Sequence, residues 1–206
     1  MKIVLLRRPF RARPKKVSWW VEKILLMVGI VAFGLWGAIN MDTYLFQMRE
    51  KVYLTQFPLS YHSPREKPPL PLPLNAGDFI GEIDIPDVGI SAAILEGSDE
   101  HSLRLGVGHI PGTALPGSSG NVSLAAHRDT FFRPLRKIKK NDEIHLITYD
   151  NSYNYRVDWI RVVPPDDINV LRPSKEPTLT LITCYPFYFV GSAPERFVVR
   201  AHRLAG

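Results

Sequence analysis

The stretch TLTLITCYPFYFVGSAPERFVVRA, residues 178–201, contains two strand-like runs separated by a segment that cannot form regular structure. Thr178 to Thr183 alternates polar and apolar residues and is rich in β-branched side chains, which predicts a strand ending at Cys184. Arg196 to His202, RFVVRAH, has the same character. The chain therefore places its only cysteine at the end of one predicted strand and an arginine at the start of the next.

The connection between these strands, Tyr185 to Glu195, carries residues that interrupt helices and strands, namely Pro186, Gly191 and Pro194. If the two strands pair antiparallel, the last residue of the first lies beside the first residue of the second. We therefore expect the Cys184 thiol and the Arg196 guanidinium to meet at one rim of a sheet.

A thiol and a guanidinium at one rim have a chemical use. A cysteine thiolate can attack an amide carbonyl, and a nearby guanidinium can stabilise the oxyanion that forms. The residues alone leave another interpretation open, because a free cysteine is often a small buried hydrophobe. Arg196 alone is equally consistent with a solvated surface residue. A catalytic interpretation needs a third residue that moves protons.

His127 is the candidate for that proton transfer. It directly follows the strand-like run Asn121 to Ala126, NVSLAA, so it closes a predicted strand as Cys184 does. Imidazole titrates near neutral pH, and a cysteine with a histidine far away in the sequence is a common layout for thiol acyl transfer. The remaining histidines show no metal-ligand spacing, so we predict neither a metal site nor a cofactor; they are His62, His101, His109, His145 and His202.

These segments resemble the sortases, the membrane-anchored cysteine transpeptidases that attach proteins to the cell envelope. The resemblance lies in TLITC, in APERFVVRA after a loop, and in NVSLAAHRDTFF upstream. It covers roughly Asp78 to Leu204 and is strongest to the class D branch. It implies Cys184 as nucleophile, His127 as acid and base, and Arg196 as stabiliser of the oxyanion or substrate. Ala126 stands where the family often has glycine, a small departure.

The resemblance also implies partners and a reaction. The partners are proteins with a C-terminal LPxTG-like sorting signal, together with an amine acceptor on a cell-wall peptide or a pilin lysine. Cys184 would form a thioester with the sorting-signal threonine and then pass the acyl group to the amine. Two alternatives remain open at this stage: an exported thiol hydrolase or peptidase that uses water as acceptor, and a non-catalytic anchored binding barrel.

The basic character of the chain belongs to its N-terminus. Eight of the 26 Lys and Arg residues, but only one of the 20 Asp and Glu residues, lie before residue 24. The remaining 18 basic and 19 acidic residues almost balance. A nucleic-acid-binding domain would carry its basic residues within the folded body. We therefore expect no nucleic acid among the partners.

An apolar segment, Val17 to Ile39, follows the basic cluster, and it is uncharged from Ile24 onward. With its flanks it reaches the ~20 residues that a membrane-spanning helix needs. A cleaved signal peptide and a buried core helix are the competing interpretations. No A-x-A-like cleavage site follows the segment, which favours a retained anchor. The positive-inside rule then predicts a cell-membrane protein with a cytoplasmic N-terminus and an extracytoplasmic domain.

The predicted organisation has four parts: a basic cytoplasmic tail over 1–16, a transmembrane signal-anchor helix over 17–40, a proline-rich extracytoplasmic stalk over 41–76 and a catalytic domain over 77–206. Within the stalk, residues 44–56 are compatible with a short helix before the prolines. Within the domain we expect a hairpin in 78–94, a short helix or turn in 96–105, a loop over 106–120, a helical turn in 131–138, strands at 143–148 and 153–163, and a short link over 166–171. At least six short strands with few helices predict a mainly β fold, a small closed antiparallel barrel of the sortase type.

Overall fold

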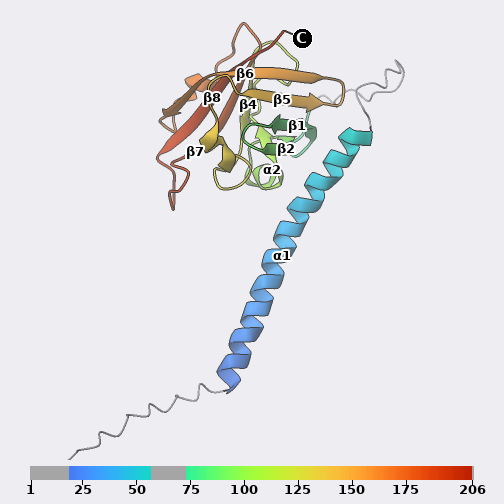
Figure 1. The fold of residues 1–206 in the computed structure, drawn as a ribbon, viewed down its shortest axis with the longest axis vertical. Coiled ribbons are helices and arrows are strands. Elements are labelled where there is room, and N and C mark those ends of the chain that lie inside the picture. The colour runs from blue at the N-terminus through green and yellow to red at the C-terminus, as the bar shows by residue number, and fades with distance from the viewer. Residues whose placement is uncertain (1–18, 57–72, 206) are drawn as a thin grey trace, which may run out of the picture. The chain divides into compact units, whose positions relative to one another are not determined.

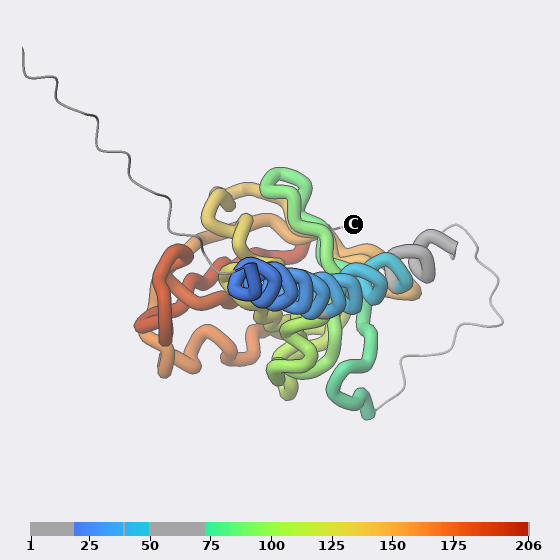
Figure 2. Tube along the Cα trace, turned by 90° about the horizontal axis from the view of Figure 1, so that it is seen from below, coloured from blue at the N-terminus to red at the C-terminus, as the bar shows by residue number. Residues whose placement is uncertain are grey.

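The computed structural model describes residues 19–56 and 73–205. The basic tail and residues 57–72 of the predicted proline-rich stalk lie outside these residues. The chain divides into two compact units, 1–42 and 43–206. The first helix, α1 (Trp19–Gln56), runs without a break and is coloured blue to cyan in Figures 1 and 2. It therefore continues beyond the predicted anchor and places residues 41–56, which we assigned to the stalk, in a helix.

Part of α1 is long and apolar enough to cross a membrane. The segment Trp19–Arg49 has 31 residues and contains a window of mean hydropathy 2.1, none of which is buried. Large apolar side chains such as Leu25, Phe33 and Trp36 are exposed on it. In a soluble protein such side chains would face a core, whereas on α1 they face outward without one.

The second unit contains a closed β-barrel of eight strands in the described part of the chain, in the order β1-β2-β3-β4-β7-β8-β6-β5 (Figure 1). The strands are β1 (Phe79–Ile85), β2 (Ile90–Glu96), β3 (Val107–His109), β4 (Asn121–Ala125), β5 (Glu143–Thr148), β6 (Ser152–Val163), β7 (Thr178–Tyr185) and β8 (Glu195–Arg203). The short helical elements are α2 (Glu100–Leu105), η1 (Arg133–Lys137) and η2 (Ile168–Leu171). The predicted mainly β barrel is confirmed.

Neighbouring strands of the barrel are antiparallel except for two pairs. β2 pairs parallel with β3, and β4 pairs parallel with β7. The predicted hairpin is present, since β1 and β2 pair antiparallel around a turn in which Gly89 adopts a φ of 72°. Glycine adopts a positive φ at little cost because it has no Cβ, which explains why this residue stands at the turn.

The prediction of a loop throughout 106–120 is wrong at its start. Val107–His109 forms β3, between β2 and β4. Gly106 before the strand and Gly108 within it disfavour a strand locally, but both neighbouring strands supply backbone hydrogen bonds. A Cβ on Gly108 would lie 2.3 Å from the Gly97 carbonyl oxygen, so only glycine fits this close approach of two backbones.

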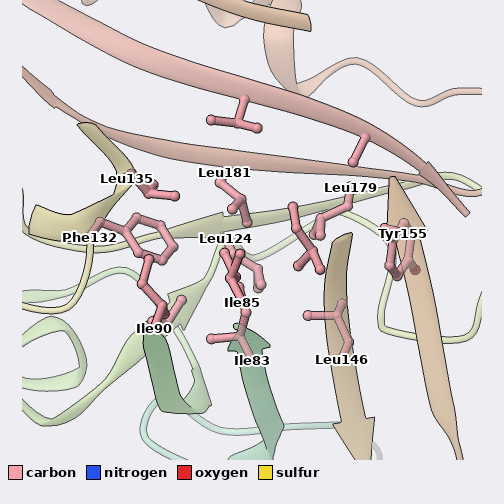
Figure 3. Packing of buried hydrophobic residues seen from close by; sticks show 14 of the residues in the cluster. Ile83, Ile85, Ile90, Leu124, Phe132, Leu135, Leu146, Tyr155, Leu179 and Leu181 are labelled. Carbon is pink, nitrogen blue, oxygen red and sulfur yellow. The ribbon is translucent and has the colours of Figure 1, made fainter. Parts of the chain in front are cut away.

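The barrel interior is filled with aliphatic side chains from every one of the eight strands. Figure 3 shows them converging from separate strands; they include Ile83, Ile85, Ile90, Leu124, Leu146, Leu179 and Leu181. Phe132 and Leu135 close the core from the segment around η1. Tyr155 is also fully buried, and burial raises the pKa of its phenol to about 12. This filled interior leaves chemistry to the barrel rims.

Candidate active site

The predicted pairing of Cys184 with Arg196 is present in the structure. β7 and β8 are antiparallel, and Cys184 lies directly opposite Arg196 in their register. Opposed residues on antiparallel strands have Cβ atoms about 4.5–5.5 Å apart. Both strands extend one residue further toward the loop than predicted, to Tyr185 and from Glu195. The connecting loop is therefore residues 186–194, which we call the β7–β8 loop.

His127 reaches the same rim through the parallel pairing of β4 with β7. The pairs run with a constant offset from Asn121 opposite Thr178 to Ala125 opposite Ile182. Continued by two residues, that register brings His127 level with Cys184. Neighbouring strands lie about 4.8 Å apart, so the two residues share one rim.

Hydrogen bonds hold the β4 and β7 backbones together beyond the last paired residues. The Ala126 N–H donates to the Ile182 carbonyl at 3.3 Å, and the buried Thr183 hydroxyl donates to the Ala126 carbonyl at 2.7 Å. After His127 the chain turns, since the His127 carbonyl accepts from the Phe132 N–H at 3.3 Å. Phe132 is fully buried and fixes that turn to the core.

The site residues differ in how far solvent reaches them. Cys184 is a free thiol and is half-buried. The His127 side chain is 34% exposed, and its Nε2 lies 3.7 Å from Oε1 of Glu100, which is 87% exposed. Solvent therefore reaches both side chains in part, which a site for a polypeptide substrate requires. A buried, inert cysteine, the arrangement expected of a binding barrel, is not what the structure contains.

The Arg196 guanidinium contacts the end of the β7–β8 loop. Its Nη1 donates to the Ala193 carbonyl at 3.2 Å and to the Glu195 carbonyl at 3.0 Å. A guanidinium has five N–H donors in a fixed fork, so further donors remain for a substrate. The arrangement can therefore supply a nucleophile, a proton carrier and an anion stabiliser at one rim.

His109, another histidine at the end of a strand, is buried. It is 2% exposed, and its Nδ1 lies 2.7 Å from Oε2 of Glu96. Its Nε2 lies 3.0 Å from the Ala114 carbonyl and 3.1 Å from the Thr113 hydroxyl. Both ring nitrogens therefore lie within hydrogen-bond distance of protein groups, and His109 connects β2, through Glu96, to Thr113 and Ala114 in the 110–120 segment.

Two residues near the site received no role from the sequence. Glu100 is the first residue of α2, and Asp99 before it is the N-cap. The pKa of the Asp99 carboxyl is lowered mainly by a hydrogen bond from the Ser102 hydroxyl, and further by one from the Ser102 N–H. Arg128 directly follows His127 and contacts the β7–β8 loop. Its adjacency to His127 was the available signal, whereas nothing local links Glu100 to His127.

No group of three or more His, Cys, Asp or Glu side chains within the described residues is placed to hold a metal ion. The candidate site is made of the Cys184 thiol, the His127 imidazole and the Arg196 guanidinium.

Comparison with known proteins decides the family. The family model of the sortase domain matches residues 83–204, more than half of the chain. The chain belongs to the sortase family. The matched range contains Cys184, His127 and Arg196, together with seven complete strands of the barrel.

Among curated relatives, this sortase is 33% identical to Sortase D of Bacillus subtilis (strain 168) over 129 residues, 62% of this chain and 65% of the relative. It is 32% identical to Sortase A of Bacillus anthracis over 130 residues, 61% of this chain and 60% of the relative. The chain thus spans somewhat less than two thirds of the length of these relatives.

Solved structures give the same answer. A Clostridium perfringens Sortase D5 transpeptidase is similar with a TM-score of 0.67 and 29% identity, over 82% of this chain and 99% of that one. Sortase A from Corynebacterium diphtheriae has a TM-score of 0.59 and 35% identity, over 63% and 62%. The resemblance to the sortases, class D among them, is confirmed.

Proposed function

We propose that this sortase is a cysteine transpeptidase that cleaves an LPxTG-like sorting signal and transfers the acyl group to an amine. The observation that carries the proposal is the register of three adjacent strands. The β4–β7 register, continued two residues beyond its last pair, would put His127 level with Cys184, and Arg196 lies opposite Cys184 in the β7–β8 register. The likeness to sortases supports it.

The proposed reaction has two acyl transfers. In the first, the Cys184 thiolate attacks the carbonyl carbon of the sorting-signal threonine, the C–N bond breaks, and the His127 imidazolium gives its proton to the departing amine. In the second, an incoming neutral amine attacks the thioester, the C–S bond breaks to release the Cys184 thiolate, and the proton of the amine passes to His127. Covalent catalysis divides one difficult transfer into two easier ones, and Arg196 stabilises both oxyanions.

The test uses the full-length protein in detergent with a library of LPxTG-like peptides, with and without triglycine as the amine. Mass spectrometry of the products separates the candidates. We expect a peptide–triglycine product that requires the amine and that Cys184→Ala abolishes. Hydrolysed peptide at an unchanged rate in both conditions would make the protein a thiol hydrolase. No product, together with a thiol that resists alkylation, would make it a binding barrel.

We also propose that α1 anchors the protein in the cell membrane, with the N-terminus in the cytoplasm, the barrel outside and the proline-rich segment before it as a spacer. The exposed apolar surface of Trp19–Arg49 supports this, since its 31 residues exceed the ~20 that a helix needs to cross a bilayer core. The basic cluster before it supports the orientation.

Protease added to intact cells should degrade the barrel while the N-terminal tail stays protected. The full-length protein should remain with the membrane after alkaline extraction. Recovery of a soluble form that begins near Met41 would show cleavage of the segment and contradict the anchor.

A further inference from the structure

The β7–β8 loop joins the strand that carries Cys184 to the strand that carries Arg196. Its tip is apolar and exposed: Tyr188, Phe189 and Val190 are all solvent-facing, and Val190 is 96% exposed. In Figure 1 this orange-red segment extends past the ends of the strands. A loop with so few buried side chains needs fixed contacts at its base if the residues at its two ends are to keep one geometry.

One side of the loop base is held by aromatic rings. Phe187 packs edge to face against Phe197 with ring centroids 5.1 Å apart, and Tyr185 stacks on Phe197 at 6.2 Å. These contacts connect the start of the loop to β8. They leave the side that faces His127 to other residues.

Arg128 holds that other side. Its Nη1 donates to the Pro186 carbonyl at 3.1 Å, and its Nη2 donates to the Gly191 carbonyl at 2.9 Å. Its guanidinium carbon also lies 5.9 Å from the centroid of the Phe189 ring. The two acceptors lie on the two limbs of the loop, so one side chain bridges them.

We propose that Arg128 is a positioning residue that fastens the β7–β8 loop to the end of β4 and so holds His127, Cys184 and Arg196 in one geometry. Arg128 directly follows His127 in the sequence. Pro186 lies two residues after Cys184, and Gly191 lies five residues before Arg196. The inference rests on the proposed function, because it explains how that site is kept in order.

Arginine suits this task for a geometric reason. Its planar fork presents two parallel donors at fixed separation, and hydrogen bonds from a charged donor are stronger than neutral ones. Lysine keeps the charge but cannot bridge two carbonyls with the same fixed geometry. Reactions of this kind lose about a hundredfold in rate when reacting groups are displaced by about 1 Å. The fork therefore acts on rate more than on substrate binding.

The first test measures the loop itself and does not depend on catalysis. Full-length protein in detergent is treated with chymotrypsin, and the rate of cleavage after Phe187, Tyr188 or Phe189 is followed by mass spectrometry. We expect Arg128→Ala to raise this rate about tenfold, as loss of two charge-assisted hydrogen bonds implies. The matched control is Arg136→Ala, since Arg136 lies 5.7 Å from the Tyr188 ring but makes no hydrogen bond to the loop among the described residues. It should stay within about twofold.

The second test measures turnover of the LPxTG-like peptide that the unsubstituted protein accepts. We expect Arg128→Ala to lower kcat about tenfold or more with KM changed by less than about twofold, an unchanged melting temperature, and little recovery in Arg128→Lys. Equal chymotrypsin cleavage of all variants, or full recovery by lysine, would overturn the proposal. If no peptide is turned over by the unsubstituted protein, the proposed function fails, while the chymotrypsin comparison still decides the role of Arg128.

Discussion

The barrel contains two histidines at strand ends, and their surroundings differ. His109 ends β3 and is buried, with one ring nitrogen on the Glu96 carboxylate and the other beside the Ala114 carbonyl. His127 follows β4 at the rim, partly open to solvent, with the Glu100 carboxylate 3.7 Å from its Nε2. Both lie near a carboxylate, but within the part of the chain that the structure describes only His109 has both ring nitrogens within hydrogen-bond distance of protein groups.

The comparison shows how one residue type is used for structure in one place and for chemistry in another. A buried imidazole bound at both nitrogens cannot exchange a proton with a substrate without breaking contacts that hold the chain. A half-exposed imidazole level with a thiol can receive and release one. The functional assignment therefore depends on unused hydrogen-bonding capacity and on the register of β4 with β7.

Replacing His127 gives the largest expected effect. His127→Ala should lower the rate of transpeptidation by about a hundredfold to ten-thousandfold, the usual contribution of a positioned acid and base. Cys184 should still react with iodoacetamide, and the melting temperature should not change. Steady-state assays with the accepted peptide measure the effect. Near-full activity in this variant would mean that another base serves the reaction, and it would contradict the catalytic role that distinguishes His127 from His109.

Replacing Arg196 should lower the rate of transpeptidation almost as much as replacing His127. Losing an oxyanion donor costs about a hundredfold to a thousandfold in rate. Because the donors act by position, Arg196→Lys should fail nearly as badly as Arg196→Ala. Peptide kinetics with both variants measure this, and alkylation of Cys184 serves as the control. If lysine restores most of the alanine defect, charge alone suffices and the guanidinium fork is not required.

His109 should show the opposite pattern, a loss of stability with retained chemistry. His109→Ala leaves the largely buried Glu96 carboxylate without its partner, which we expect to lower the free energy of unfolding by about 2 to 4 kcal/mol. Denaturant unfolding of the barrel measures it. At a temperature where the variant is folded, turnover should stay within about threefold. A stable but inactive His109→Ala protein would move the proton-transfer role to this residue.

Glu100 should have the smallest effect. Its pair with His127 is solvent-exposed, and exposed pairs contribute at most about 1 kcal/mol and weaken with salt. Glu100→Gln should therefore change turnover by less than about threefold, and the difference should vanish near 1 M salt. A tenfold loss that persists at high salt would show that Glu100 orients His127 directly.

The sequence was sufficient for the parts of the site that depend on neighbouring strands. Alternation of polar and apolar residues predicted both strands around Cys184 and Arg196. The pairing of these two residues was predicted on the condition that the strands run antiparallel, and the β7–β8 register meets that condition.

The remaining features depend on distant parts of the chain. His127 and Cys184 follow the paired residues of β4 and β7, two parallel strands far apart in sequence, and no local pattern specifies that register. β3 was missed because its three residues include a glycine and are a strand only between two neighbours. The Arg128 contacts were missed because their acceptors are backbone carbonyls of an irregular loop.

The most direct test of the central claim is to capture the covalent intermediate on Cys184. Full-length protein is mixed with the accepted LPxTG-like peptide without an amine, quenched in acid and analysed as intact protein and as proteolytic fragments. The account predicts a mass increase equal to the acyl part of the peptide, ending at threonine, on the fragment that contains Cys184. Hydroxylamine should remove it, and it should be absent from Cys184→Ala. Cleavage of the peptide by Cys184→Ala at the normal rate, or an adduct on another residue, would contradict the account.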